Sequence, residues 1–255
     1  MCYDNNARPP EHGIGGGGSG TEITLTASDG NTFMAFLAQA DQPKGAQILI
    51  YPDVRGLHPF YKELALRFAE AGYTALAMDY FGRTAGLTAR EDSFDWQTHV
   101  PQMTWPTFTN DVRASVAHLH SLSPAPQPIF TVGFCMGGAL SLYSSMEDLG
   151  LAGVIGFYAG MRRVWIESKG SLPDAGVHAR IPVLGLFGGG DAGIPAEQVH
   201  ALDAALDKSG VSHAIHSYDG APHSFFDRRY AEWKEACDDA WGRIFEFIEG
   251  EKKAA

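Results

Sequence analysis

The chain contains 255 residues, of which 45% are hydrophobic and 19% charged, and its formal net charge is −11. This composition is typical of a globular protein that buries a sizeable core. The negative charge argues against a nucleic-acid partner, because phosphate binding needs a basic face. A small anionic substrate remains compatible with it, because a single local arginine can override the global balance.

Three cysteines, Cys2, Cys135 and Cys237, are widely spaced and form no CxxC motif. Their number and spacing favour neither a disulfide framework nor a zinc site, and they fit a reducing cytoplasm, where a catalytic thiol stays usable. No apolar run approaches the ~18 residues that a membrane span needs. The first residues lack the charged and apolar halves of a signal peptide. We therefore expect a cytoplasmic protein without a membrane partner.

The N-terminal part of the chain combines a polar leader with a hairpin. Residues 1–20 end in GIGGGGSG, which predicts a flexible leader, and no Lys-Ser or Lys-Thr follows these glycines to make a phosphate loop. In residues 21–40, two β-prone segments flank Asp29-Gly30-Asn31, as in a hairpin. No Pro-, Gly- or Ser-rich linker divides the rest of the chain, so we expect one domain over residues 21–255.

After the hairpin, apolar segments alternate with amphipathic ones. The pattern predicts strands at residues 46–53, 73–80, 128–134, 151–160, 181–190 and 211–220. It predicts helices at residues 60–72, 109–122, 136–146, 195–210 and 230–250. Buried strands that alternate with helices indicate an α/β fold with a mainly parallel central sheet and helices on both faces. The hairpin would add antiparallel strands at one edge.

Residues 83–106 do not fit this alternation. The segment is long and aromatic, and it follows a predicted strand directly. Long excursions in compact domains tend to be lids or binding loops, and ligands of open α/β sheets lie beyond the carboxyl ends of the strands. We expect this loop to lie beside a ligand site.

The segment from Gly133 to Gly137 reads Gly-Phe-Cys-Met-Gly, the form of a nucleophile elbow with Cys135 as the nucleophile. Glycines on both sides leave room for the sharp turn between a strand and a helix. The positive end of that helix stabilises a thiolate, and the N–H of Met136 points to where an oxyanion would form. A tight turn around a structural cysteine remains an alternative; a dinucleotide phosphate loop fits the glycine spacing less well.

An acid and a histidine follow the elbow in the order that such a fold requires. Asp191 comes directly after an apolar strand, and His223 lies in the loop after the last strand. Either residue alone could be an ordinary turn residue, but together they favour a triad with Cys135. The other histidines are not spaced to share a ligand, so we expect neither a metal nor another cofactor.

The motifs GFCMGG, GGGDAGIP and GAPHSFF, with YPDVRGLHP and MDYFGR, resemble those of the dienelactone hydrolase (carboxymethylenebutenolidase) family in the α/β-hydrolase superfamily. The resemblance runs from about residue 21 to residue 249. It implies an α/β-hydrolase fold, in which the two predicted layers of helices cover the sheet. It also implies a hydrolase that cleaves a small lactone or carboxylic ester through a thioester acyl-enzyme.

The resemblance implies roles for individual residues. Cys135 would attack the carbonyl, His223 would carry the proton, and Asp191 would orient the imidazole. The backbone N–H groups of Val54 and Met136 would form the oxyanion hole.

Four further positions bear on the substrate. Asp53 matches a family glutamate that activates the thiol, although it could instead cap a turn after Pro52. Arg83 matches an arginine that binds the substrate carboxylate, or it is a surface arginine at the start of the loop. Asp227 stands where a second such arginine would fall. Phe225 is a further candidate for substrate contact.

The aromatic side chains Trp96, Trp105 and Phe108 could wall the pocket or belong to the core. The expected substrate is a small ester or lactone, preferably with a carboxylate. The alternatives are an esterase or short-peptide hydrolase for neutral substrates, and a catalytically silent scaffold that binds a ligand. The expected assembly is a monomer or a small homo-oligomer.

Overall fold

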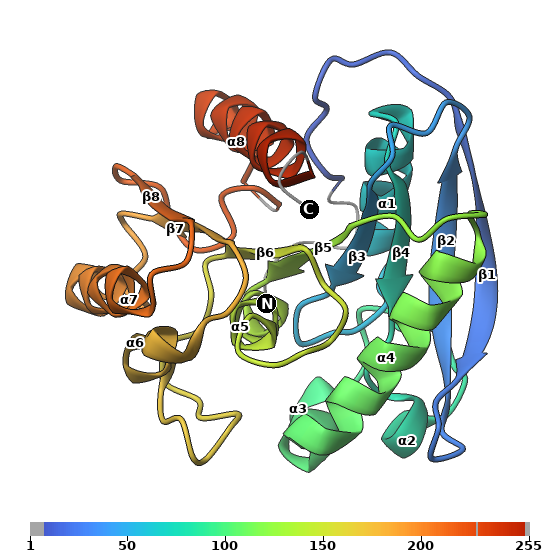
Figure 1. The fold of residues 1–255 in the computed structure, drawn as a ribbon, viewed down its shortest axis with the longest axis horizontal. Helices are drawn as coiled ribbons and strands as arrows, with labels where there is room; N and C mark the ends of the chain where they lie inside the picture. Colours follow the sequence, from blue (N-terminus) through green and yellow to red (C-terminus); the bar gives the residue numbers. More distant parts are fainter. Residues whose placement is uncertain (1–7, 228, 253–255) are drawn as a thin grey trace.

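The computed structural model describes residues 8–227 and 229–252. In this part of the chain, eight strands form one sheet in the order β1-β2-β4-β3-β5-β6-β7-β8 (Figure 1). The strands are β1 (Gly18–Thr26), β2 (Thr32–Ala40), β3 (Gln47–Tyr51), β4 (Thr74–Met78), β5 (Ile129–Phe134), β6 (Gly153–Phe157), β7 (Val183–Gly188) and β8 (His213–Tyr218). Neighbours from β4 to β8 are parallel, whereas β1 and β2 pair antiparallel at one edge. The predicted mainly parallel sheet with its hairpin is confirmed.

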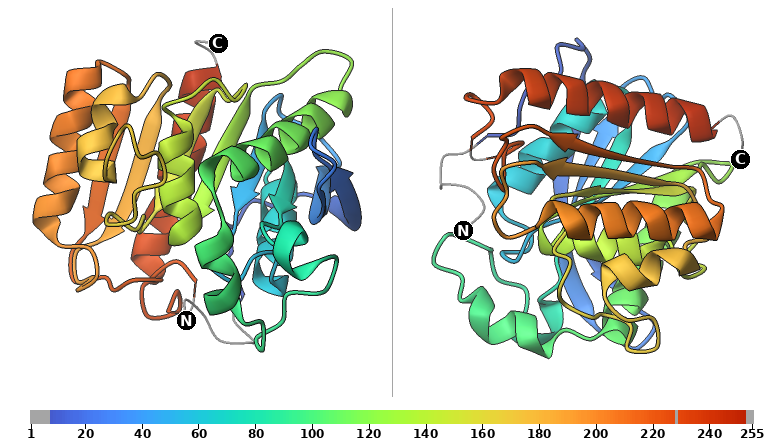
Figure 2. Two further views of the ribbon diagram at one scale, coloured as in Figure 1. Left: turned by 90° about the horizontal axis from the view of Figure 1, so that it is seen from below. Right: turned by 90° about the vertical axis from the view of Figure 1, so that its left-hand side faces the viewer.

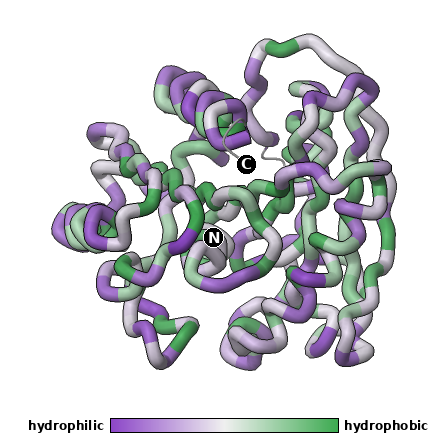
Figure 3. Tube along the Cα trace, viewed as in Figure 1, coloured by the Kyte–Doolittle hydropathy of each residue, from purple (hydrophilic) through white to green (hydrophobic). Residues whose placement is uncertain are grey.

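The central strands are buried along their whole length, and this explains their sequences. Every residue of β3, β4, β5, β6 and β7 is buried. A sheet that is covered on both faces needs continuous apolar runs rather than alternating ones. Figure 3 shows hydrophobic segments gathered along these strands, while the outer helices alternate between hydrophobic and hydrophilic residues.

Helices cover the two faces of the sheet (Figure 2). The helices α1 (Pro59–Glu70) and α8 (Lys234–Lys252) pack on one face, and α4 (Trp105–Ser121), α5 (Met136–Ser144) and α7 (Ala196–Ser209) pack on the other. In α1, Leu64 and Phe68 are fully buried, as the spacing of its apolar residues predicts. No helix in the described ranges is long and apolar enough to cross a membrane.

The order of the strands indicates where a ligand would bind, at the carboxyl ends of β3 and β5. The chain runs from β3 to β4 on one side and then returns to β5 on the other side of β3. At such a switch point, the loops after the two neighbouring strands diverge and leave a crevice at their carboxyl ends. The residues that follow β3 and β5 at this crevice are those around Val54 and Cys135.

Part of the predicted flexible leader, residues 9–12, packs against the domain, whereas the glycine-rich residues 13–20 are exposed. Pro9 and Pro10 are buried, and the Trp241 indole on α8 donates to the Pro10 carbonyl oxygen at 3.1 Å. The His12 ring lies edge-on to Trp241, and its Nε2 is 2.6 Å from the Arg67 carbonyl oxygen. β1 already begins at Gly18, three residues before the expected start of the domain at residue 21. Residues 1–7 lie outside the described part.

The loop over residues 83–106 contains short helical pieces, α2 (Gly82–Ala85), α3 (Trp96–His99) and the 3₁₀ turn η1 (Val100–Gln102). Inside it, the Arg90 guanidinium forms a buried bidentate pair with Asp79 at the end of β4. A second long excursion over residues 158–182 follows β6 and contains α6 (Leu172–Ala175) and the 3₁₀ turn η2 (Gly176–His178). These two loops form the rim above the crevice.

Candidate active site

Cys135 lies at the turn between β5 and α5, in a strained backbone conformation with φ 56° and ψ −111°. A Cβ on Gly133 would lie 2.0 Å from the Gly137 carbonyl oxygen. A Cβ on Gly137 would lie 2.2 Å from the carbonyl oxygens of Tyr51 and Pro52. The elbow therefore requires glycine at both positions, because backbone atoms already fill the space that a side chain would occupy.

Backbone strain is concentrated around this turn. In the described residues, Cys135, Tyr158 and Ser224 are the non-glycine residues with positive φ, at 56°, 34° and 64°. Each follows a strand of the parallel sheet or lies in the loop after β8, at the carboxyl edge. Such conformations cost on the order of 1–3 kcal/mol each and persist mostly where function requires them.

Two backbone N–H groups beside Cys135 can receive an oxyanion. Met136 is the first residue of α5, so its N–H has no partner within the helix. Val54 follows β3, and both residues line the same cavity as Cys135. Neither N–H donates a hydrogen bond to another group in the described part of the chain. The positive end of α5 adds a partial positive charge at the same place.

His223 and Asp191 form the predicted pair. The Nδ1 atom of His223 lies 2.6 Å from Oδ2 of Asp191, and Oδ1 of Asp191 accepts from the Gly193 N–H at 2.8 Å. Burial alone would raise the pKa of Asp191, but the hydrogen bond and charge of His223, together with the N–H groups of Gly193 and Ile194, outweigh it, so this pKa is lowered. Asp191 therefore stays ionised at neutral pH and fixes the tautomer with hydrogen on Nδ1. In that tautomer the lone pair of the ring lies on Nε2, the atom through which the imidazole can accept a proton.

The thiol is not hydrogen-bonded to its expected partners. In residues 8–227 and 229–252, no hydrogen bond joins the Cys135 sulfur to His223 or Asp53. The structure thus brings Cys135, the His223–Asp191 pair and the two N–H groups to one edge of the sheet, and of the contacts expected for a triad it contains the one between His223 and Asp191. Catalytic hydrogen bonds are often completed only when the substrate is bound.

Asp53 makes the turn-capping contact that is the alternative to thiol activation. Its Oδ1 accepts from the Arg55 N–H at 2.9 Å, and its Oδ2 lies 3.9 Å from Arg55 Nε. Arg55 reaches on to Asp92 in the 83–106 loop, with 3.3 Å between Nη1 and Oδ1. His58 also contacts Asp92, at 3.1 Å. Asp53 therefore lies in a buried charged cluster that ties this loop to the end of β3.

A cavity of about 280 Å³ opens above Cys135. The elbow, the loop after β3, the 83–106 loop and the 158–182 loop all contribute to its wall. Its lining residues are Val54, Val100, Cys135, Met136, Ala139, Gly160, Met161, Arg162, Arg163, Trp165 and Gly193. Gly193 also holds the Asp191 carboxylate, so the His–Asp pair borders this cavity. The volume suits a small substrate.

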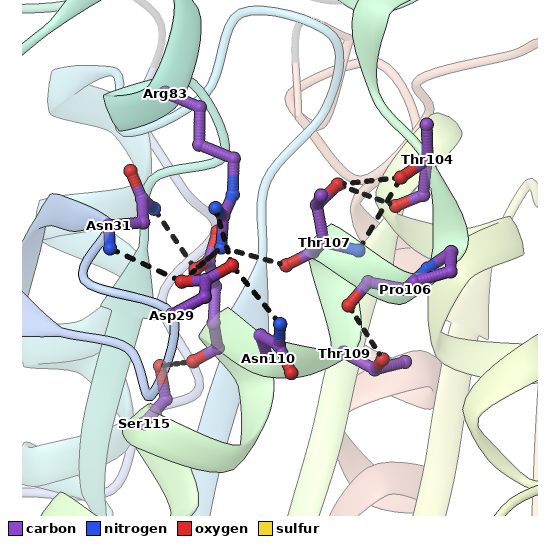
Figure 4. A network of polar contacts seen from close by, with 10 residues as sticks. Asp29, Asn31, Arg83, Thr104, Pro106, Thr107, Thr109, Asn110 and Ser115 are labelled. Atoms are coloured by element: carbon purple, nitrogen blue, oxygen red, sulfur yellow. Dashed lines mark hydrogen bonds and ion pairs between the residues drawn. The ribbon is translucent and has the colours of Figure 1, made fainter.

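Arg83 lies elsewhere and is already paired. Its guanidinium contacts Asp29 at 2.7 Å and Asp111 at 2.8 Å, and Figure 4 shows Arg83, Asn31 and Asn110 converging on Asp29. The hydrogen bond from Arg83 lowers the pKa of Asp29 to about 2. Burial raises the pKa of Asp111 despite its contact with Arg83. The same arginine therefore lowers the pKa of Asp29 below its usual value but does not do so for Asp111. These contacts join the β1–β2 hairpin to α4.

Phe225 and Asp227 are both fully buried. Phe225 packs between the rings of Tyr158 and Tyr218, and it is not among the residues that line the Cys135 cavity. Asp227 accepts a hydrogen bond from the Tyr158 hydroxyl at 2.7 Å, so this position carries a buried acid. The Tyr158 ring lies 4.8 Å from that of His223 and supports the imidazole.

Of the three aromatic candidates, Trp105 and Phe108 are buried, and Trp96 in α3 is partly exposed. Trp105 borders a neighbouring cavity of about 600 Å³, which shares Arg163 and Trp165 with the cavity at Cys135. Sequence reasoning missed Tyr158, Arg162, Arg163 and Trp165. Their only signal is position, because all follow the carboxyl end of β6.

No group of three His, Cys, Asp or Glu side chains in the described ranges could hold a metal ion.

The chain is similar in sequence to known proteins. The sequence profile of the dienelactone hydrolase family matches residues 33–251. A protein from Saccharolobus solfataricus, provisionally named a carboxymethylenebutenolidase, is 29% identical over 87% of this chain and 95% of its own. A protein of the same provisional name from Escherichia coli K12 is 24% identical over 91% of this chain and 88% of its own.

Two solved structures share the fold. A provisionally named dienelactone hydrolase from Klebsiella pneumoniae matches with a TM-score of 0.75 and 22% identity, over 90% of this chain and 99% of that one. A dienelactone hydrolase-like promiscuous phosphotriesterase from metagenomic libraries matches with a TM-score of 0.72 and 18% identity, over 92% and 99%. The expected α/β-hydrolase fold is thereby confirmed. Because the family profile covers most of its length, the chain belongs to the dienelactone hydrolase family and is a hydrolase that acts on ester or lactone bonds.

Proposed function

We propose that this protein hydrolyses small lactones or carboxylic esters with Cys135 as the nucleophile. The observation that carries the proposal is the strained elbow, which holds Cys135 in a cavity beside two unpartnered N–H groups and the His223–Asp191 pair. A structural cysteine needs neither the strain nor the donors.

The reaction would run in two steps. The substrate carbonyl enters the cavity with its oxygen toward the N–H groups of Val54 and Met136. The sulfur turns toward Nε2 of His223, gives up its proton to that atom and attacks the carbonyl carbon. The C–O bond then breaks, the alkoxide takes the proton from His223, and a thioester on Cys135 remains.

A water molecule completes the cycle. His223 removes a proton from the water, which attacks the thioester carbonyl, and the departing thiolate takes the proton back. Asp191 stabilises the imidazolium in both steps. In a lactone the leaving alkoxide stays attached to the acyl group, so the product is one hydroxy acid. The reaction uses a reduced thiol, which fits the cytoplasm expected from the cysteine pattern.

Asp53 has a supporting role in this proposal. Its contacts with the backbone and side chain of Arg55 shape the loop that presents the Val54 N–H. An aspartate is one methylene shorter than the family glutamate, and its carboxylate is engaged by Arg55. We therefore assign Asp53 the role of supporting the loop that presents the Val54 N–H, and not the role of activating the thiol.

The test combines labelling with turnover. Iodoacetamide should add one carbamidomethyl group at Cys135, found by mass spectrometry of its peptide, while Cys237 stays unlabelled because burial raises the pKa of its thiol to about 12. Wild-type protein should hydrolyse 4-nitrophenyl acetate or a dienelactone, and Cys135→Ala should not. Cys135→Ser should retain little activity, because a hydroxyl is a far weaker nucleophile at neutral pH.

Two outcomes would contradict the proposal. Unchanged turnover in Cys135→Ala would remove the assigned nucleophile. Tight binding of a small acid without any turnover in the wild-type protein would instead indicate a silent ligand-binding scaffold.

A further inference from the structure

The cavity at Cys135 has a positive wall in a negatively charged protein. Two arginines, Arg162 and Arg163, are among its lining residues, and no aspartate or glutamate is. The whole chain has a formal net charge of −11, so this local excess of positive charge is contrary to the global balance. A cationic wall around a nucleophile attracts an anionic substrate.

Arg162 is placed by the backbone of the nucleophile itself. The Gly160 N–H donates to the Cys135 carbonyl oxygen at 3.4 Å, and the following residue, Met161, is 2% exposed. These contacts fix the start of the 158–182 loop against the elbow. Arg162 then extends from an anchored segment into the cavity, where its side chain is exposed. It forms no ion pair or hydrogen bond in the described part of the chain.

Arg163 is engaged in holding the wall together. Its Nη2 donates to the carbonyl oxygens of Val100 at 3.2 Å and Met103 at 3.4 Å. Its guanidinium carbon lies 3.8 Å from the centre of the Trp165 ring. Partial burial lowers the pKa of Arg163, but a guanidinium keeps its charge at neutral pH. The arrangement adds positive charge but uses the donors of Arg163 for protein contacts.

Arg83, the alternative cation, faces another cavity. That cavity has about 60 Å³ and shares no lining residue with the one at Cys135. Its guanidinium is also neutralised by Asp29 and Asp111. A substrate carboxylate at Arg83 would have to displace a built ion-pair network.

We propose that Arg162 binds a carboxylate on the substrate and thereby selects carboxylate-bearing esters and lactones. The inference rests on the proposed function of Cys135. The planar guanidinium presents two parallel N–H donors to both oxygens of a carboxylate. Arg163 acts as a positioning residue that keeps the two loops together.

The first test compares charged and neutral esters of equal chain length. The probes are the 4-nitrophenyl half-esters of glutaric, adipic and pimelic acid and the 4-nitrophenyl esters of the corresponding monocarboxylic acids. For each pair, the measured quantity is the ratio of kcat/KM for the charged ester to that for the neutral one. This ratio cancels a general loss of folding or activity.

In wild-type protein, at least one half-ester should be preferred over its neutral partner. Arg162→Gln and Arg162→Met should each lower that preference about tenfold, the lower end of what a charged hydrogen bond contributes, because Arg162 is exposed. Arg180→Gln is the matched control, since it removes one exposed positive charge before β7, at the opposite edge of the sheet. It should leave the ratio unchanged, as should Arg83→Gln.

The second test does not depend on turnover. Iodoacetate and iodoacetamide both alkylate a thiolate with loss of iodide, but only iodoacetate carries a carboxylate. The ratio of their rates at the Cys135 peptide should fall severalfold in Arg162→Gln and stay constant in Arg180→Gln.

The outcomes separate the two proposals. Hydrolysis by the wild-type protein without any preference for half-esters would overturn the role of Arg162 and leave Cys135 as the nucleophile. A preference that disappears in Arg83→Gln but survives in both Arg162 variants would also overturn it. Turnover that survives in Cys135→Ala would refute the catalytic proposal, and the alkylation ratio would still decide the role of Arg162.

Discussion

Replacing Cys135 by glycine should give a thermally more stable protein than replacing it by alanine, and both substitutions should abolish hydrolysis. The backbone at Cys135 has φ 56° and ψ −111°, a region that side chains with a Cβ rarely adopt. Alanine at the same position removes the sulfur but keeps the Cβ. The pair Cys135→Gly and Cys135→Ala therefore isolates the backbone strain from the loss of the thiol.

The magnitude follows from two opposing contributions. Relief of the strain should stabilise the glycine variant by about 1–3 kcal/mol, and the greater freedom of glycine in the unfolded chain offsets about 0.5–1 kcal/mol of this. The net difference from alanine is about 0.5–2 kcal/mol. With an unfolding entropy of about 2.1 cal/mol/K per residue, a chain of 255 residues gains about 2 °C in Tm per kcal/mol. We expect Cys135→Gly to melt about 1–4 °C above Cys135→Ala.

Scanning calorimetry at constant scan rate measures the difference, with 4-nitrophenyl acetate as the activity readout. The control is Ala139→Gly in α5, where the backbone is helical and glycine should destabilise the protein by about 1 kcal/mol. If Cys135→Gly melts at or below Cys135→Ala, the turn stores no strain and the argument from backbone conformation fails.

Three further substitutions test the surrounding structure. Gly133→Ala should cost about 3 kcal/mol or more in urea unfolding, because its Cβ would meet the Gly137 carbonyl oxygen at 2.0 Å; a smaller cost would mean that the turn relaxes easily. Burial, and after it the charge of Arg55, lower the pKa of His58 from 6.5 to about 4. The unfolded chain therefore binds this proton more tightly than the folded one, so the stability of the protein should fall as the pH drops from about 6.5 toward 4. Between pH 7.5 and 5, the wild-type protein should lose about 2 kcal/mol more than His58→Gln, and parallel losses would contradict this assignment. Arg90→Met should cost about 3–5 kcal/mol by leaving a buried carboxylate without its bidentate partner, and a loss below 1 kcal/mol would show that the pair contributes little.

The central sheet and the elbow could be predicted because local sequence determines them. Unbroken apolar runs are what a doubly covered strand requires, and they identify β3 to β7. The glycines at 133 and 137 are set by contacts within the turn and with the adjacent strand β3. The order of Cys135, Asp191 and His223 then follows from the topology.

The environment of the predicted substrate residues could not be read in the same way. Arg83 meets Asp29 from the hairpin and Asp111 from α4, and nothing in the local sequence indicates that these segments converge. The N-terminal segment is similar, because its partner Trp241 lies 231 residues further along the chain. The contact is made by Pro10, and nothing in the local sequence around this proline indicates a distant tryptophan as its partner.

The loop over residues 158–182 escaped prediction for another reason. Its helical pieces are too short to show a period, and its main anchors are backbone groups. The Gly160 N–H and the carbonyl oxygens of Val100 and Met103 carry no sequence signature. The position of this loop beside the cavity can therefore be determined only from the three-dimensional structure.

The bridge from Arg163 to Val100 and Met103 has a consequence for engineering. It joins the rims that follow β4 and β6, so neither is an independent module. A chimera that receives the rim after β6 from a homologue without this arginine would lose the donor, and one that receives the rim after β4 with another backbone path would move the two carbonyl oxygens away from Arg163. Transplanting specificity into this scaffold therefore requires exchanging both segments as a matched set.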